Sequence, residues 1–249
     1  MTTELVEILD NPAWHSLTGP HAGLGEGDGL ARRYRRDISV FHALADVRDP
    51  LAWADLAALA GPGGEVTISG DDAAPPPGWT LVAGGTGVQL VETPAVSPRR
   101  DPEAEVLDST DPAVVAEMLA LVERNQPGPF LSGTPKMGTY LGIRRAGRLI
   151  AMAGERVHPE GWTEISAVCT DPEFRGQGLA GSLVRSVTAG IHARGERALM
   201  HAAATNTGAI SVYLGLGFAL RRHTTFRLLR APGDATGPHP LEVEARQPA

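Results

Sequence analysis

Hydrophobic positions in the second half of the chain predict two amphipathic helices. Asp111 and Pro112 begin the first helix, where apolar side chains between 114 and 122 fall on one face. The second helix is predicted at 179–193, because apolar residues recur there every three or four positions up to Gly195. Both helices therefore have one face suited to packing against a sheet.

Strand patterns surround these helices. Apolar segments at 139–144, 148–157 and 162–170 are separated by short turns, and such connections require antiparallel neighbours. Further elements are predicted in chain order at 105–107 (strand), 198–202 (strand), 207–214 (helix) and 218–229 (strands). The expected fold class is α/β (α+β), with a mixed, mostly antiparallel sheet flanked by helices.

The first half has weaker signals and is predicted to be a smaller α/β domain. Helices are expected at 11–17 and 51–59 and strands at 65–69 and 79–82, with no catalytic constellation. A stretch with three prolines and several charges indicates a linker. The predicted division is a domain at 1–92, a linker at 93–103, a second domain at 104–230 and an extended tail at 231–249.

Composition narrows the possible functions. The formal net charge of −7 argues against a general nucleic-acid binder, which needs a basic surface. The basic run at 32–36 fits either a phosphate or nucleic-acid contact or a solvated polar stretch. Cys169 is the single cysteine, which excludes an internal disulfide and a Cys-rich metal cluster. We expect a cytoplasmic protein with no membrane segment, no nucleic-acid partner and no metal.

The segment 168–181 carries the clearest chemical signal. It runs from a strand end through a turn into the start of a helix, where free backbone amides and the helix dipole attract an anion. Gly176 and Gly178 allow the backbone to approach phosphate oxygens closely. A pyrophosphate is the expected ligand.

Two other nucleotide-binding classes match this segment less well. Gly176, Gly178 and Gly181 have the spacing of the dinucleotide fingerprint, and Glu196 lies 20 residues after the first glycine. However, residues 171–175 separate the strand from the glycines, and that strand belongs to an antiparallel meander, unlike a Rossmann unit. A P-loop triphosphatase is disfavoured because no Gly-Lys-Ser/Thr follows.

Two blocks of the second half resemble the GCN5-related N-acetyltransferases, the GNAT superfamily. In its details the sequence of this half resembles the FR47-like branch of that superfamily. The first block, which matches the family's Arg/Gln-x-x-Gly-x-Gly/Ala signature, is Arg175-Gly176-Gln177-Gly178-Leu179-Ala180. The second block, which lies roughly 30 residues further on, is Asn206-x-x-Ala209-x-x-x-Tyr213-x-x-x-Gly217-Phe218. The first half has no acyl-CoA motif, and by analogy alone it would be a degenerate GNAT-like half.

The resemblance implies that acetyl-CoA is the co-substrate. Main-chain groups of Val168 and Thr170 would pair with the pantetheine arm, and amides of 176–181 would hold the pyrophosphate. The full set that it assigns to the co-substrate is Val168, Cys169, Thr170, Arg175, Gly176, Gln177, Gly178, Leu179, Ala180, Gly181 and Asn206. For three of these another role is open: Cys169 as a core residue, Arg175 as a surface arginine and Asn206 as a helix cap.

The same resemblance assigns catalytic roles. Tyr213 would protonate the departing CoA thiolate, and the other possibility is a tyrosine that only packs on the sheet. Glu164 and His201 are the candidate bases, although Glu164 could face solvent, His201 could fill the sheet and a water chain could serve instead. The loop at 126–138 is expected to border the acceptor site, with Phe130 and Met137 as pocket residues or surface anchors.

The expected function is an acyl-CoA-dependent N-acyltransferase, an N-acetyltransferase that moves acetyl from acetyl-CoA to a primary amine in a ternary complex. The acceptor would be a small-molecule or peptide amine, which the sequence does not identify. The alternative is a non-catalytic acyl-CoA-binding or regulatory module.

Overall fold

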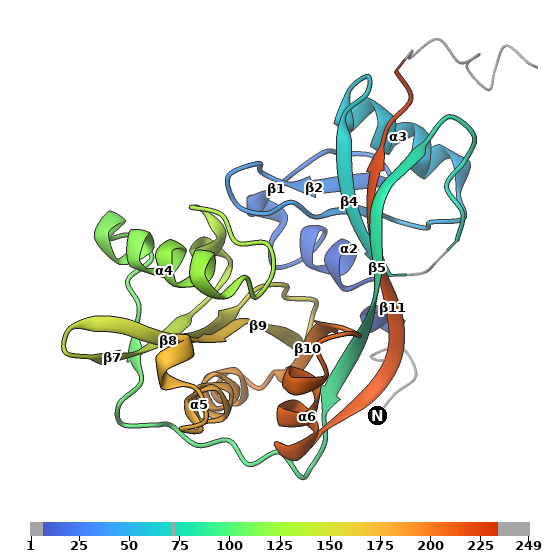
Figure 1. Ribbon diagram of the computed structural model, residues 1–249. Coiled ribbons are helices and arrows are strands. Elements are labelled where there is room, and N and C mark those ends of the chain that lie inside the picture. Colours follow the sequence, from blue (N-terminus) through green and yellow to red (C-terminus); the bar gives the residue numbers. More distant parts are fainter. Residues whose placement is uncertain (1–6, 71–72, 234–249) are drawn as a thin grey trace, which may run out of the picture.

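A computed structural model describes residues 7–70 and 73–233, and its centre is an eight-stranded sheet (Figure 1). In spatial order the strands are β4 (Glu65–Gly70), β11 (Phe218–Arg230), β5 (Thr80–Glu92), β10 (Arg197–Ala203), β9 (Trp162–Thr170), β8 (Arg148–Glu155), β7 (Tyr140–Arg145) and β6 (Glu105–Val106). A smaller sheet contains β1 (Gly25–Glu26), β2 (Ala31–Tyr34) and β3 (His42–Leu44). The patterns described above predict no strand of this smaller sheet.

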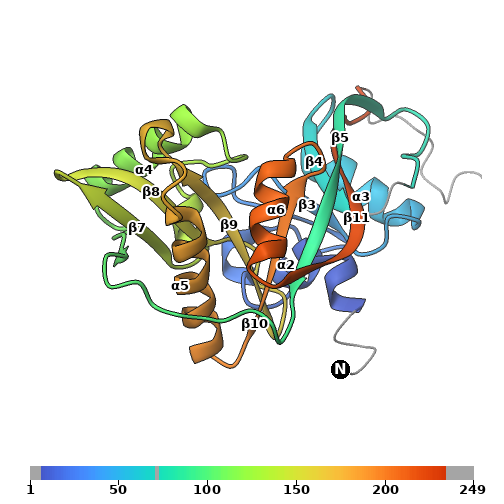
Figure 2. The ribbon, with the colours of Figure 1, turned by 60° about the horizontal axis from the view of Figure 1, so that its bottom comes forward.

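Helices cover both faces of the large sheet. α4 (Pro112–Asn125) packs on one face of β8 and β9, and α5 (Leu179–Ala193) packs on the other (Figure 1). α6 (Thr207–Gly215) lies on the same side of the sheet as α5 (Figure 2), and its Tyr213 belongs to the same core. α2 (Pro12–Leu17) and α3 (Pro50–Ala60) belong to the first half. The 3₁₀ turns are η1 (Ile8–Asp10), η2 (Ala22–Leu24), η3 (Thr134–Met137) and η4 (Pro172–Phe174). The predicted α/β class with a mixed sheet flanked by helices is confirmed.

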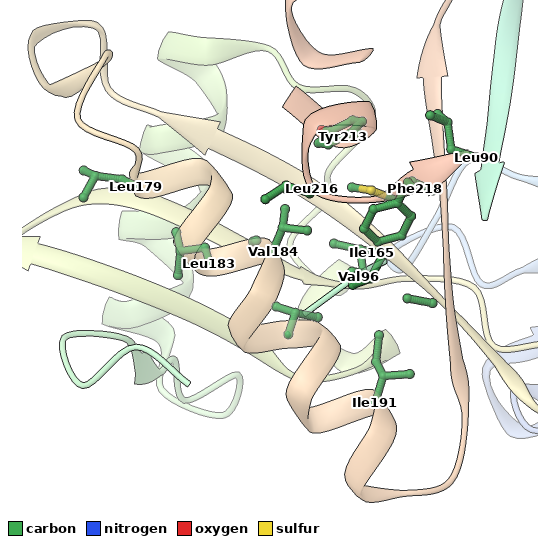
Figure 3. Packing of buried hydrophobic residues seen from close by; sticks show 14 of the residues in the cluster. Leu90, Val96, Ile165, Leu179, Leu183, Val184, Ile191, Tyr213, Leu216 and Phe218 are labelled. Atoms are coloured by element: carbon green, nitrogen blue, oxygen red, sulfur yellow. The ribbon is translucent and has the colours of Figure 1, made fainter. Parts of the chain in front are cut away.

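The two predicted Asp-Pro helix starts form as expected. Asp111 accepts a hydrogen bond from the backbone amide of Ala113 at 2.8 Å, and Asp49 accepts one from Leu51 at 2.8 Å. Each cap satisfies an amide that has no partner inside the helix. The apolar stripe of α5 then enters the main core, where Leu183, Val184 and Ile191 are buried (Figure 3).

One parallel pair interrupts the antiparallel sheet and creates a gap. β9 and β10 pair in parallel from Trp162 with Arg197 to Ile165 with Met200, and their pairing stops there. Ala167 then takes a left-handed φ of 53°, and the register between β8 and β9 shifts nearby. Beyond Ile165 the two strands no longer share hydrogen bonds, so main-chain groups of β9 are left for another partner.

Strands of the first half lie inside the same sheet. β5 pairs with β10 on one side and with β11 on the other, and β11 separates β5 from β4. The strand predicted at 79–82 was too short, because β5 continues to Glu92 through a glycine-rich stretch that resembles a turn. The division at 93–103 stays a prediction, and most of the predicted tail, from 234 onward, lies outside the described residues.

A histidine pair, with His21 buried and His158 partly buried, joins the N-terminal segment to the loop between β8 and β9. The rings of His21 and His158 lie 4.7 Å apart, and His158 donates its backbone amide to the Ser16 hydroxyl at 3.0 Å. Burial, and then the nearby His158, lowers the pKa of His21 to about 4. Burial also lowers the pKa of His158. Both rings are therefore neutral in the folded protein at neutral pH.

We expect acid to destabilise the protein through His21. The unfolded chain binds a proton below about pH 6.5, and the folded ring resists it down to about pH 4. The free energy of unfolding should fall by up to about 1.4 kcal/mol per pH unit in this window. Urea unfolding at pH 7 and pH 5 should show a smaller loss for His21→Gln, whereas His223→Gln, which alters an exposed histidine, should retain the full loss. An unchanged pH dependence in His21→Gln would contradict this assignment.

Candidate active site

The predicted phosphate loop has the geometry of an anion site. After η4, Gly176 and Gly178 each adopt a φ of 77°, a conformation that favours glycine. Gly178 is the N-cap of α5 without a side-chain cap, and its carbonyl accepts the first helical bond from Ser182 at 3.0 Å. The amides of Leu179, Ala180 and Gly181 consequently have no partner within the helix. They are available to an anion at the positive end of the helix dipole.

A cavity of about 440 Å³ lies beside this loop. Its lining consists of Val168, Cys169, Thr170, Phe174, Arg175, Gly176, Gly178, Leu179, Ala180, Gly181, Arg185, Ala209, Val212 and Tyr213. Of the residues predicted to bind the co-substrate, Gln177 and Asn206 do not line it. No atom lies within 4 Å of a Cβ built on Gly176 or Gly178, so a ligand can reach this backbone. Two arginines and no carboxylate among the lining residues fit a diphosphate.

A second cavity, of about 340 Å³, begins where β9 and β10 separate. Its lining consists of Phe41, Thr67, Gln126, Pro127, Gly128, Pro129, Arg156, Ile165, Ser166, Ala167, Val168, His201, Ala202, Ala203, Asn206, Ala209, Tyr213 and Phe226. We call the first cavity the loop cavity and the second the acceptor cavity, a name that refers to the acceptor site expected from the sequence beside the loop at 126–138. Val168, Ala209 and Tyr213 line both, so the two cavities meet at these side chains.

Tyr213 lies at this junction on α6, near Leu216 and Phe218 (Figure 3). Its side chain is largely buried, and burial raises the pKa of its phenol to about 12. The hydroxyl therefore keeps its proton at neutral pH and can act as a proton donor at the point where the cavities meet.

Glu164 lies beneath the acceptor cavity and does not line it. The residue is 1% exposed, and its Oε1 is 2.6 Å from Nη2 of Arg156 and 2.9 Å from Nδ1 of His201. Its Oε2 accepts a second bond from Nε of Arg156 at 3.1 Å. Burial alone would raise the pKa of this carboxyl, but Arg156 and then His201 lower it well below its ordinary value. Glu164 is therefore an ionised, fully engaged carboxylate.

His201 lines the acceptor cavity, but both of its nitrogens have protein partners. Gln89 donates from Nε2 to the Leu9 carbonyl at 2.8 Å, and its Oε1 accepts from Arg221 at 2.8 Å. This orientation directs the Gln89 amide nitrogen at Nε2 of His201, 3.0 Å away. Nε2 is therefore the acceptor, and the proton on Nδ1 points to Glu164.

The remaining predicted residues have defined places. Burial raises the pKa of the Cys169 thiol to about 12, so it is no thiolate nucleophile, although it lines the loop cavity from the core. Asn206 caps α6 by accepting from Ala209 at 3.2 Å, and it also lines the acceptor cavity. Arg175 binds the Thr170 carbonyl and Asn125.

Residues 126–129 of the loop between α4 and β7 line the acceptor cavity, and the identity of this cavity as the acceptor site stays a prediction. Phe130 and Met137 instead lie in separate apolar cores, so they neither shape this cavity nor anchor the surface. Phe130 packs edge-on against Tyr140 with ring centroids 5.5 Å apart.

Sequence reasoning missed five site residues: Phe41, Thr67, Gln89, Arg156 and Phe226. Three of them come from the first half, where no motif marks them. Phe41 and Thr67 are joined by a β-bridge that places both at the cavity wall. Arg156 lies inside the strand predicted at 148–157 and one residue beyond the observed end of β8, and only its contact with Glu164 distinguishes it from a surface arginine.

No helix within residues 7–70 and 73–233 is long and apolar enough to cross a membrane. Within the same residues no group of three or more His, Cys, Asp or Glu side chains is placed to hold a metal ion.

Parallel strands that separate beside a helix N-terminus, with a protonated tyrosine between two cavities, are the arrangement that the resemblance to the GNAT superfamily predicts. Comparison with known proteins agrees: residues 140–227 match the FR47-like protein family. A protein of known structure from Novosphingobium aromaticivorans, assigned to the GNAT family of acetyltransferases, is 40% identical, with 89% of this chain and 97% of that chain covered and a TM-score of 0.80. The chain belongs to the GNAT superfamily and to its FR47-like branch.

Two more distant relatives extend the comparison. Mycothiol acetyltransferase of Saccharopolyspora erythraea is 32% identical over 148 residues, which are 58% of this chain but only 45% of that relative's length. A GCN5-related N-acetyltransferase from Kribbella flavida is 20% identical, with 90% and 97% of the two chains covered and a TM-score of 0.58, so it supports the fold alone.

Proposed function

We propose that this protein is an N-acetyltransferase that transfers acetyl from acetyl-CoA to a primary amine by direct attack in a ternary complex. The observation that carries the proposal is the meeting of two cavities at Tyr213, one beside unpaired helix amides and the other between separated strands. A co-substrate and an acceptor can thus be present together, on either side of one proton donor.

The loop cavity is the proposed acetyl-CoA site. Amides of residues 179–181, with Arg175 and Arg185, would hold the diphosphate. Main-chain groups of Val168 and Thr170, beyond the last pairing of β9 with β10, would take up the pantetheine arm. Acetyl-CoA would supply the acetyl group as a thioester.

Tyr213 is the proposed acid. Its pKa of about 12 keeps the proton on the phenol until a thiolate, with an ordinary thiol pKa of about 8.5, develops beside it. Because a phenol of that pKa is a weaker acid than a thiol, the transfer requires that burial raise the pKa of the thiol as well and that the resulting phenolate be stabilised at the junction.

His201 is the better-placed of the two predicted bases. It lines the acceptor cavity, whereas Glu164 is shielded from it by Arg156 and His201. Nε2 of His201 becomes available only when its contact with Gln89 opens, and Glu164 would then stabilise the imidazolium. Glu164 is thus proposed to position His201.

A non-catalytic acyl-CoA-binding module is the second candidate. It is favoured by one observation, that both nitrogens of His201 and both oxygens of Glu164 already have protein partners. Calorimetry with CoA and thiol release from acetyl-CoA with a panel of primary amines separate the two. Binding with amine-dependent release supports the enzyme, and binding without release supports the module.

We expect Gly178→Ala to weaken CoA binding about tenfold or more. A Cβ at a φ of 77° costs roughly 1–2 kcal/mol, and the methyl group lies in the phosphate cradle. Gly190→Ala is the matched control, because Gly190 lies inside α5 with no atom near its added Cβ and should bind CoA normally. Equal dissociation constants by calorimetry for both variants would remove the loop from the proposed site.

A further inference from the structure

The acceptor cavity has an unusual balance of charge. Of the described residues that line it, Arg156 alone carries a permanent charge, and none is an aspartate, glutamate or lysine. Its other walls include the aromatic rings of Phe41 and Phe226 and the hydroxyls of Thr67 and Ser166. An acceptor with several ammonium groups would find no carboxylate here to offset its loss of hydration.

Arg156 presents one end of its guanidinium to this cavity. Nε and Nη2 bind Glu164, at 3.1 and 2.6 Å, while within the described chain Nη1 has no hydrogen-bond or ion-pair partner. Burial would lower its pKa, but the charge of Glu164 raises it, so the group stays cationic. The side chain is held in place by Phe41, whose ring centroid lies 5.0 Å from the guanidinium carbon.

The partner carboxylate lies on the other side of this guanidinium. Glu164 is 1% exposed and absent from the cavity wall, and its remaining contact is with His201. The ion pair therefore directs its positive end toward the cavity and its negative end into the protein. A fixed guanidinium in an apolar, partly desolvated wall favours an anionic oxygen group.

We infer that the acceptor amine carries a carboxylate, and that Arg156 recognises it through Nη1. This inference rests on the proposed function. In the reaction, the amine nitrogen bonds to the acetyl carbon and the thioester C–S bond breaks. The amine loses one proton to the base, and the thiolate gains one from Tyr213. Arg156 touches only the carboxylate, so it determines specificity.

Wild-type protein tests the inference without any substitution. Glycine, leucine and phenylalanine are each compared with the corresponding amino-acid amide and decarboxylated amine, by thiol release from acetyl-CoA. We expect kcat/KM to be about 10–100-fold higher for the best carboxylate than for its two analogues, as charge-assisted hydrogen bonds predict. Equal or better use of the amides or plain amines overturns the inference and leaves the proposed function intact.

Turnover of no amine would overturn the proposed function, and direct binding then decides the inference. With CoA-loaded protein, acetate, isovalerate and phenylacetate are compared with their amides for thermal stabilisation. Stabilisation by a carboxylate alone supports the Arg156 site, and equal stabilisation by acid and amide contradicts it.

Arg156→Lys provides the residue-level test. It keeps the charge for Glu164 but loses the fork that binds two carboxylates at once. We expect the ratio of kcat/KM for the carboxylate acceptor to kcat/KM for its amide to fall about tenfold or more, with the dissociation constant of CoA within about twofold. An equal loss for acid and amide would indicate a structural role alone. If Arg156→Lys does not fold, the double variant Arg156→Met with Glu164→Leu replaces it in this test. The double variant should lose the preference for the acid over the amide.

Discussion

Replacement of Tyr213 by phenylalanine is expected to lower kcat by about 100-fold or more. The change removes the hydroxyl proton at the meeting point of the two cavities, while the ring that packs with Leu216 and Phe218 remains. The dissociation constant of acetyl-CoA should stay within about twofold, because the proposed phosphate contacts come from the α5 amides. Steady-state thiol release and calorimetry measure the two quantities separately.

Tyr140→Phe is the matched control. The Tyr140 hydroxyl is buried without a hydrogen-bond partner among the described residues, and it lines neither cavity. Its removal should leave kcat unchanged and should not lower stability. A kcat for Tyr213→Phe that matches the Tyr140→Phe value would exclude Tyr213 as the acid.

Glu164→Gln is expected to lower the free energy of unfolding by about 3–5 kcal/mol. The substitution leaves Arg156 buried without a counter-charge, and uncompensated buried charges carry penalties of this size. The exposed pair of Arg145 and Glu103 offers the control, since Glu103→Gln should cost less than about 1 kcal/mol. Urea unfolding of the two variants and of the wild type at pH 7 measures the difference.

The ion pair of Arg156 and Glu164 also determines how the free energy of unfolding depends on pH. Because the folded-state pKa of Glu164 lies below its ordinary value, its contribution is present above about pH 4.5 and is lost as the pH falls below it. The double variant with Arg156→Met and Glu164→Leu should recover much of the lost stability, since an apolar pair of similar volume needs no charge compensation. If Glu164→Gln causes no large loss of stability and the double variant recovers none, the ion pair of Arg156 and Glu164 is accessible to water.

Local patterns predicted most of the second half. The α5 helix, the three antiparallel strands and the phosphate loop follow from spacing over fewer than about 20 residues, where periodicity and turn chemistry act. The loop cavity contains most of the residues assigned from those patterns. The location of Tyr213 on a helix could be predicted because the motif that contains it covers one short helix and the residues next to it.

The acceptor side could not be predicted in the same way. Gln89 and His201 meet across 112 positions, and an isolated β-bridge joins Phe41 to Thr67 of β4 at the cavity wall. Such contacts arise from strand order, which no local period encodes. Strand β5 was cut short for a related reason: residues 83–87 look like a turn, and only pairing with β10 and β11 makes them extended.

The position of β11 has a consequence for biosynthesis. β4 and β5 follow each other along the chain, yet β11 occupies the space between them. Until residues 218–230 have left the ribosome, the nascent first half displays two open edges with unmet hydrogen bonds, which invite aggregation. We therefore expect the protein to reach its native state in one step, after residues 218–230 have been synthesised. Before then, we expect chaperones to bind the unpaired edges of β4 and β5.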